Sequence, residues 1–221
     1  MTRGYLYISI LILAAVLIPF YISFEKSRPY ARQIVLVAVM TALAVASRAA
    51  FFWFPQFKPV IAVIIIAGIA MGAKAGFVVG SMTAFVSNFL FGQGPWTPFQ
   101  MVAWGIIGMA AGLLFSRKYM SREMPEKAEQ SGSIRELMPV LIYGAVSCFL
   151  IHGAITDIWT LLSISDKPTL GELITVYSAG LIPDLILASA TVIFLAAAAD
   201  PMLRKLKRMQ IKYGMIQEAV Q

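Results

Sequence analysis

The fold is decided by residues 31–51, which read ARQIVLVAVMTALAVASRAAF. Between Arg32 and Phe51 the only charged residue is Arg48. A helix of about 20 apolar residues spans the hydrocarbon core of a bilayer. The chain contains further apolar runs, so that the helices we expect cover 5–24, 33–54, 60–72, 76–91, 99–116, 137–162 and 173–199. Six or seven crossings with short connections therefore account for nearly the whole length.

The overall composition supports a membrane protein. Of the 221 residues, 59% are hydrophobic and 13% are charged, whereas a soluble domain needs more charge to keep its surface in water. We therefore predict an all-α integral membrane protein, in which residues 31–203 form a six-helix substrate-binding bundle. Residues 1–30 form an extra N-terminal transmembrane helix and a cytoplasmic linker, and residues 204–221 form a basic cytoplasmic tail. The single cysteine, Cys148, excludes an internal disulfide framework and any multi-cysteine metal or iron–sulfur site.

The N-terminal run has two interpretations. Arg3 followed by an apolar stretch is typical of a secretory signal peptide as well as of a first transmembrane helix. No small-x-small cleavage site follows the run, and cleavage would leave Lys26, Arg28 and Arg32 outside the cell. We predict an uncleaved extra helix.

The distribution of lysine and arginine predicts the orientation. Alternate connections place fourteen of these residues on one side of the membrane and three on the other, with Arg48 inside a helix. Because cytoplasmic loops are enriched in positive charge, we expect a multi-pass protein of the plasma membrane with a cytoplasmic C-terminus. Segments 55–59, 92–98 and 163–172 then face outside.

Three segments depart from plain spanning helices. Run 60–72 is short, which suggests a tilted or re-entrant helix. Segment 117–136 is charged and contains Pro125 and Gly132, which indicates a cytoplasmic linker between two halves of the bundle. Segment 204–213, RKLKRMQIKY, suits an interfacial helix on anionic lipid, although positive-inside anchoring explains it equally well.

Small residues recur at intervals of four in two of the runs. Such stripes let another helix approach closely, and this contact is the main source of helix association in lipid. The alanine stripe serves either a partner or the protein's own bundle, and it consists of Ala38, Ala42, Ala46 and Ala50. The glycine stripe is expected to serve internal packing around a turn at Lys74, and it consists of Gly68, Gly72, Gly76 and Gly80.

Polar residues inside the runs are costly in hydrocarbon and indicate a cavity or buried pairs. Counted along the helices, Arg48, Asn88 and His152 all fall in the outer half of the membrane. Asp157 and Asp184 lie beneath the same outer loops. We expect these residues to line an outward-open pocket for a solute, and the alternative is structural pairing, for example of Arg48 with Asp184. His152 has no second histidine to join it, so we expect no metal site.

The outer connection 92–104, GQGPWTPFQMVAW, combines glycines and prolines that fix a turn with aromatic and amide side chains. Trp96 is either a residue of the headgroup belt or, with Phe99 and Trp104, a flat surface for a ring-containing ligand. We favour a lid over the pocket. The predicted substrate-binding residues are Arg48, Lys58, Asn88, Gln93, Trp96, Thr97, Gln100, Trp104, His152, Asp157 and Asp184.

Several catalytic motifs are missing from the sequence. The chain has no GxxxxGK[ST] phosphate loop, no GxSxG and no HExxH. We therefore predict neither an enzyme nor a cofactor, and any uphill transport must draw on a partner or on an ion gradient.

Three stretches resemble the S components of energy-coupling factor (ECF) vitamin transporters: residues 31–51, PQFKPV at 55–60, and SNFLFGQGPWTPFQMVAWGIIG at 87–108. The resemblance extends over residues 31–213, whereas the extra N-terminal helix departs from the six-helix pattern of the family. It implies that outer loops capture a vitamin and that an AxxxA face of the first core helix docks on a scaffold membrane subunit driven by two ATPases. In this chain that face consists of Ala38, Ala42 and Ala46.

The leading hypothesis is therefore a binding and translocation subunit of an ECF-type ABC importer for a vitamin or related micronutrient, with cobalamin as the best single guess. One alternative is a gradient-driven secondary carrier or channel, with an ion path through Arg48, Asp157 and Asp184. Another is a membrane enzyme using His152 and Asp157, for which no nucleophile or metal site is evident.

Overall fold

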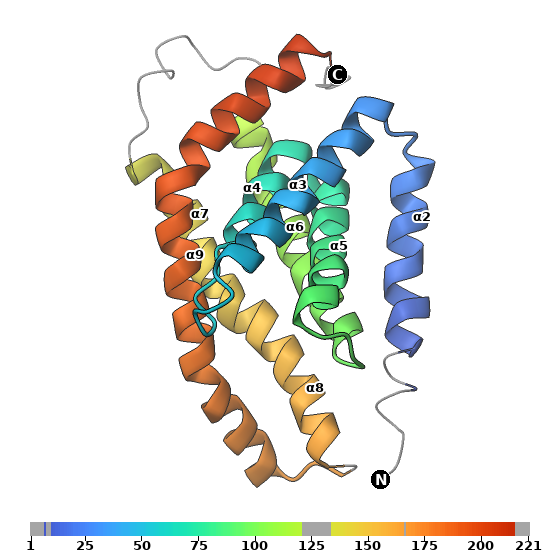
Figure 1. Ribbon diagram of the computed structural model, residues 1–221, viewed down its shortest axis with the longest axis vertical. Helices are drawn as coiled ribbons and strands as arrows, with labels where there is room; N and C mark the ends of the chain where they lie inside the picture. Colours follow the sequence, from blue (N-terminus) through green and yellow to red (C-terminus); the bar gives the residue numbers. More distant parts are fainter. Residues whose placement is uncertain (1–6, 8–9, 121–133, 166, 215–221) are drawn as a thin grey trace.

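The computed structural model describes residues 7, 10–120, 134–165 and 167–214, and helices with short connections make up this part of the chain (Figure 1). The prediction of an all-α protein is confirmed. The α-helices are α2 (Ile18–Lys26), α3 (Ala31–Ala50), α4 (Val60–Met71), α5 (Ala73–Phe91), α6 (Thr97–Met120), α7 (Ile134–Ser147), α8 (Ala154–Ile164) and α9 (Leu170–Lys212). Two π-helical turns, η1 (Leu13–Leu17) and η3 (Cys148–Gly153), lead into α2 and α8.

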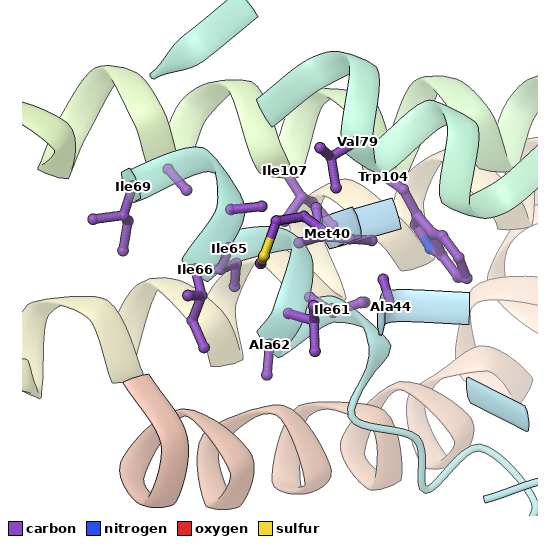
Figure 2. Packing of buried hydrophobic residues seen from close by; sticks show 14 of the residues in the cluster. Met40, Ala44, Ile61, Ala62, Ile65, Ile66, Ile69, Val79, Trp104 and Ile107 are labelled. Carbon is purple, nitrogen blue, oxygen red and sulfur yellow. The ribbon is translucent and has the colours of Figure 1, made fainter. Parts of the chain in front are cut away.

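In the part of the chain that the structure describes, five helical segments are long and apolar enough to cross a membrane: 31–50, 73–91, 97–120, 135–164 and 170–212. The short segment is α4, whose residues from Val60 to Ala70 are all buried. Helices α3, α5, α6 and α9 pack around it, and Figure 2 shows Met40 and Ile107 beside the isoleucines of α4. A helix of this length rises only about 18 Å, too little to span a bilayer. Because its neighbours enclose it, α4 does not have to reach both membrane surfaces.

The glycine stripe brings three helix backbones into contact. A Cβ atom on Gly68 or Gly76 would lie 2.1 or 2.4 Å from the carbonyl oxygen of Gly108 on α6. A Cβ atom on Gly80 would lie 2.1 Å from the carbonyl oxygen of Trp104. The expected packing role is confirmed at these three positions. Gly72 differs, because it has open space around it and a φ of +84°, which makes the turn between α4 and α5.

The extra N-terminal helix is docked on the bundle. The described chain is helical from residue 10 to Lys26, and α2 lies beside α5 (Figure 1). The ring of Phe20 stacks on Phe77 with 4.0 Å between centroids, and the Tyr21 hydroxyl donates to Ser81 Oγ at 2.8 Å. Leu17 is buried in the hydrophobic core, and η1, to which it belongs, contacts α6. These contacts pack α2 against the core, while its retention in the mature protein stays a prediction.

The two ends of the bundle differ in chemistry. We call the end that carries linker 27–30, the turn at Gly72 and the C-terminal turns of α6 and α9 the basic end. The opposite end, with loops 51–59 and 92–96, is the aromatic end. The tail 204–213 is helical, but it continues α9 and is not a separate interfacial helix. At about 65 Å, α9 is longer than a bilayer is thick. The predicted linker falls mainly on residues 121–133, which lie outside the described residues, as do residues 215–221.

Replacing Gly76 with alanine should destabilise the protein. The added methyl group meets the Gly108 carbonyl, which is backbone and cannot move aside, so α5 and α6 must separate at a cost of about 1–3 kcal/mol. The thermal unfolding midpoint of the purified protein measures this effect. Gly171→Ala is the matched control, because a Cβ atom there meets nothing within 4 Å. Equal midpoints for the two variants would contradict the close packing.

Candidate solute-binding site

Arg48 lies in the last turn of α3 and points toward α5. Its Nη1 donates to Ser87 Oγ and to Asn88 Oδ1, the latter at 2.8 Å. The guanidinium carbon lies 4.2 Å from the ring centroid of Phe91 and 5.1 Å from that of Trp104. Within the described part of the chain Arg48 forms no ion pair with a carboxylate. A positive charge is thus held by neutral oxygen atoms and aromatic faces.

Asn88 connects this arginine to the next helix. Its side chain is 1% exposed, and its Nδ2 donates to Thr97 Oγ1 at 3.1 Å and to Gln100 Oε1 at 2.8 Å. Its Oδ1 accepts from Arg48. The oxygen and the nitrogen of the Asn88 amide therefore both have hydrogen-bond partners. Through these bonds the position of Arg48 is fixed relative to α6.

The connection between α5 and α6 is rigid. Thr97 donates to Gln93 Oε1 at 3.0 Å, and Gln93 Nε2 donates to the carbonyl oxygen of Phe85 at 2.8 Å. The N–H of Gly94 donates to Thr97 Oγ1 at 3.3 Å, and Gly92 has a φ of +103°. The fixed turn expected from the glycines and prolines is present, and its polar side chains hold the turn together.

A cavity of about 220 Å³ opens between α3, α5, α6 and α8 at the aromatic end. Aromatic rings form much of its wall, and Trp159 lies 6.1 Å from Trp96 and 5.9 Å from Phe99 between ring centroids. Arg48 is the one charged residue among those that line it. The lining residues are Arg48, Asn88, Phe91, Gly92, Trp96, Phe99, Gln100, Thr156, Trp159 and Thr160.

Loop 51–59 lies against the same site. Phe52 contacts Phe91 with 5.3 Å between centroids, and the Lys58 ammonium lies 5.5 Å from the Phe91 ring. Partial burial, together with the positive charge of Arg48, lowers the pKa of Lys58 below its ordinary value. Two cations thus lie near one aromatic ring. Such a site suits a planar ligand that stacks on aromatic faces and offers oxygen atoms to positive groups.

Comparison with known proteins decides the family. The sequence model of the family described as "ECF-type riboflavin transporter, S component" matches residues 30–199. The chain belongs to this family. No curated protein and no solved structure matches it. As an ECF S component, the chain is a multi-pass membrane protein and a substrate-specific subunit of a vitamin transporter, which is a transport role and not an enzymatic one.

Two of the predicted residues lie behind the cavity wall of the S component. Trp104 is buried beneath Arg48, and its indole N–H donates to His152 Nδ1 at 3.2 Å. Neither residue lines the cavity. Trp104 therefore supports the arginine from below, and it does not provide the ligand surface that we expected. Among the described residues no cluster suited to a metal ion occurs.

The two aspartates lie apart from the cavity, along the seam between α8 and α9. Each carboxylate packs on a glycine of the other helix, so that a Cβ atom on Gly153 would lie 1.9 Å from Asp184 Oδ2, and one on Gly180 would lie 2.5 Å from Asp157 Oδ2. The predicted convergence with Arg48 does not occur, and the alternative ion pair between Arg48 and Asp184 is also not formed. The segment formed by η3 and α8 thus packs closely on α9 at both glycines.

Apart from Gly92, which has no side chain, sequence reasoning missed four lining residues. Phe91 belongs to α5, and Thr156, Trp159 and Thr160 belong to α8. The three α8 residues follow the i, i+3, i+4 spacing of a single helix face, which was the available signal. In this helix the charged residue Asp157 was predicted to bind the solute, but its side chain packs against Gly180 of α9 and not on the cavity.

Replacing Asn88 with leucine should destabilise the S component by about 2–4 kcal/mol, because it leaves Arg48, Thr97 and Gln100 without their shared partner. The free energy of unfolding in detergent measures this loss. Thr175→Val is the control, since the Thr175 hydroxyl is exposed and bonds only the backbone of its own helix. Equal stability of the two variants would contradict the stabilising role of the hydrogen bonds made by Asn88.

Proposed function

We propose that this S component binds riboflavin, or a vitamin with a similar planar ring system, in the cavity at the aromatic end. The observation that carries the proposal is the placement of Arg48, which lies over the ring of Phe91, in a cavity that Gln100 and Trp159 also line. A tricyclic ring stacks on such faces, and its carbonyl oxygens accept hydrogen bonds from the guanidinium and from the Gln100 amide. Membership in a family described by riboflavin transport supports the same substrate.

The expectation of cobalamin is not confirmed. A cavity of about 220 Å³ lies below the range of roughly 300–1,000 Å³ usual for drug-sized ligands. A corrin with its nucleotide is far larger than this space, whereas a flat ring with a polar chain that extends toward the outer loops fits it better. The size of the cavity therefore favours the smaller vitamin.

Helix α3 supports the proposed coupling to a scaffold subunit. Leu36, Met40 and Ala44 face the core, while the stripe of Ala38, Ala42 and Ala46 is exposed. The alternative that this stripe packs within the protein's own bundle is thereby weakened. We propose that a scaffold membrane subunit, energised by two ATPases, docks on this stripe. We also propose that the basic end faces the cytoplasm, because lysine and arginine concentrate there.

Ligand binding can be tested by riboflavin fluorescence, which is quenched when the ring stacks on tryptophan. Trp159→Leu should weaken binding roughly tenfold, because stacking on an aromatic side chain contributes about 1–3 kcal/mol. Trp53→Leu is the matched control, since Trp53 lies on the first outer loop, is 86% exposed and does not line the cavity. Failure of the unaltered protein to quench riboflavin, or an equal loss in both variants, would refute the assignment.

Coupling can be tested separately. Ala42→Trp places a bulky ring on the exposed stripe and should abolish both co-purification with the scaffold and ATPase subunits and ATP-dependent uptake, while riboflavin binding is retained. Leu113→Trp is the control, because Leu113 is an exposed apolar residue on α6. Uptake by the isolated chain in liposomes that collapses with an ion gradient would instead support a secondary carrier.

A further inference from the structure

A second cavity, of about 420 Å³, lies at the basic end and is larger than the cavity at the aromatic end. Five parts of the chain form its wall: the end of α2 with linker 27–29, the first turns of α3, the turn between α4 and α5, the end of α6, and α9. From α9, Gln210 is buried and its Nε2 donates to the carbonyl oxygen of Ala70 at 2.8 Å. This bond fixes the C-terminal part of α9 against the turn.

The polar groups of this cavity are mainly hydrogen-bond donors. Arg28 and Lys74 are its charged residues, and no aspartate or glutamate is among the described residues that line it. Gln33 Oε1 accepts from the Tyr30 N–H, so its Nε2 is left to donate. The first turn of α5 has no side-chain cap, and its N–H groups lie at the same wall. The C-terminal ends of α2, α4 and α6 also reach this wall, but the two full positive charges, the amide donor and the N-terminus of α5 together favour an anion.

The extra N-terminal helix is required for this cavity. Phe24, Ser27, Arg28 and Pro29 belong to its wall and precede residue 30, where the family match begins. A bundle that started at residue 30 would lack this wall and one of the two cations. The cavity is thus a property of this chain beyond the six-helix pattern.

The apolar residues of the cavity wall indicate which kind of molecule bears the anionic group. Phe24, Leu36, Met71 and Met120 line the cavity beside the polar groups. The cavity lies at the helix ends, where lipid headgroups are found, and basic pockets between transmembrane helices on the cytoplasmic side bind anionic headgroups. We propose that this cavity binds the phosphate group of an anionic phospholipid, with Arg28 and Lys74 as its cationic partners. The proposal does not depend on which solute the other cavity binds.

Native mass spectrometry of the full chain, titrated with phosphatidylglycerol or phosphatidylcholine, tests this proposal. We expect phosphatidylglycerol to be retained preferentially. The double variant Arg28→Asn, Lys74→Gln should weaken its binding roughly tenfold or more. Asparagine is chosen because Arg28 has a φ of +48°, which asparagine tolerates. The charge-preserving pair Arg28→Lys, Lys74→Arg should bind within about threefold of the unaltered protein.

The matched control is Lys26→Gln, Lys118→Gln, which removes two positive charges from the same end without touching the cavity wall. An equal loss in this control would overturn the proposal and show diffuse attraction to basic residues. Ser116→Glu, which puts a negative charge on the wall, should also weaken binding, and it replaces the double variant if that variant does not fold. Protection of the protein by inorganic phosphate but not by phosphatidylglycerol would overturn the lipid assignment in favour of a soluble anion.

Discussion

The contact between the backbones of α4, α5 and α6 at Gly68, Gly76 and Gly108 is the constraint on which the rest of the bundle depends. In a bilayer, helices associate through close packing, because lipid tails are as apolar as the side chains. At these glycines the helices approach so closely that a methyl group has no space. The approach holds α5 and α6 at a fixed spacing, so that Asn88 of one helix meets Thr97 and Gln100 of the other. The polar network at the aromatic end is therefore built on an apolar contact deeper in the bundle.

That network also explains how an arginine is accommodated inside a membrane protein. A charge in hydrocarbon is costly and is tolerated where it faces the bundle interior and finds partners. Arg48 finds two neutral oxygen acceptors and two aromatic faces, and no carboxylate among the described residues. Its charge is stabilised without being neutralised. An electron-rich ligand placed against it gains an interaction that the protein's own carboxylates do not already satisfy.

The helices could be predicted from the sequence, because the length of a hydrophobic run shows whether a helix can span the membrane. The depth of the polar residues could be predicted as well, because each residue advances a helix by a fixed rise. Arg48 and Asn88 were placed at similar depths and do meet. Counting does not report the direction in which a side chain points around the helix axis. Asp157 and Asp184 have a suitable depth but turn toward the seam of α8 and α9, and Trp104 turns beneath Arg48. Trp159 was missed because an interfacial tryptophan has many ordinary explanations in a membrane protein.

The π-helical turn at Cys148–Gly153 separates two halves of one long helix that have different tasks. In an α-helix each residue advances the direction of the side chain by about 100°, so the wider turn changes the direction of every residue that follows it. Helix α7 can keep its apolar side on the core, while α8 presents Thr156, Trp159 and Thr160 to the cavity. The composition of one half can then diverge between relatives without disturbing the other. The residues that we propose to contact the solute are in this way separated from those that pack the core within a single transmembrane segment.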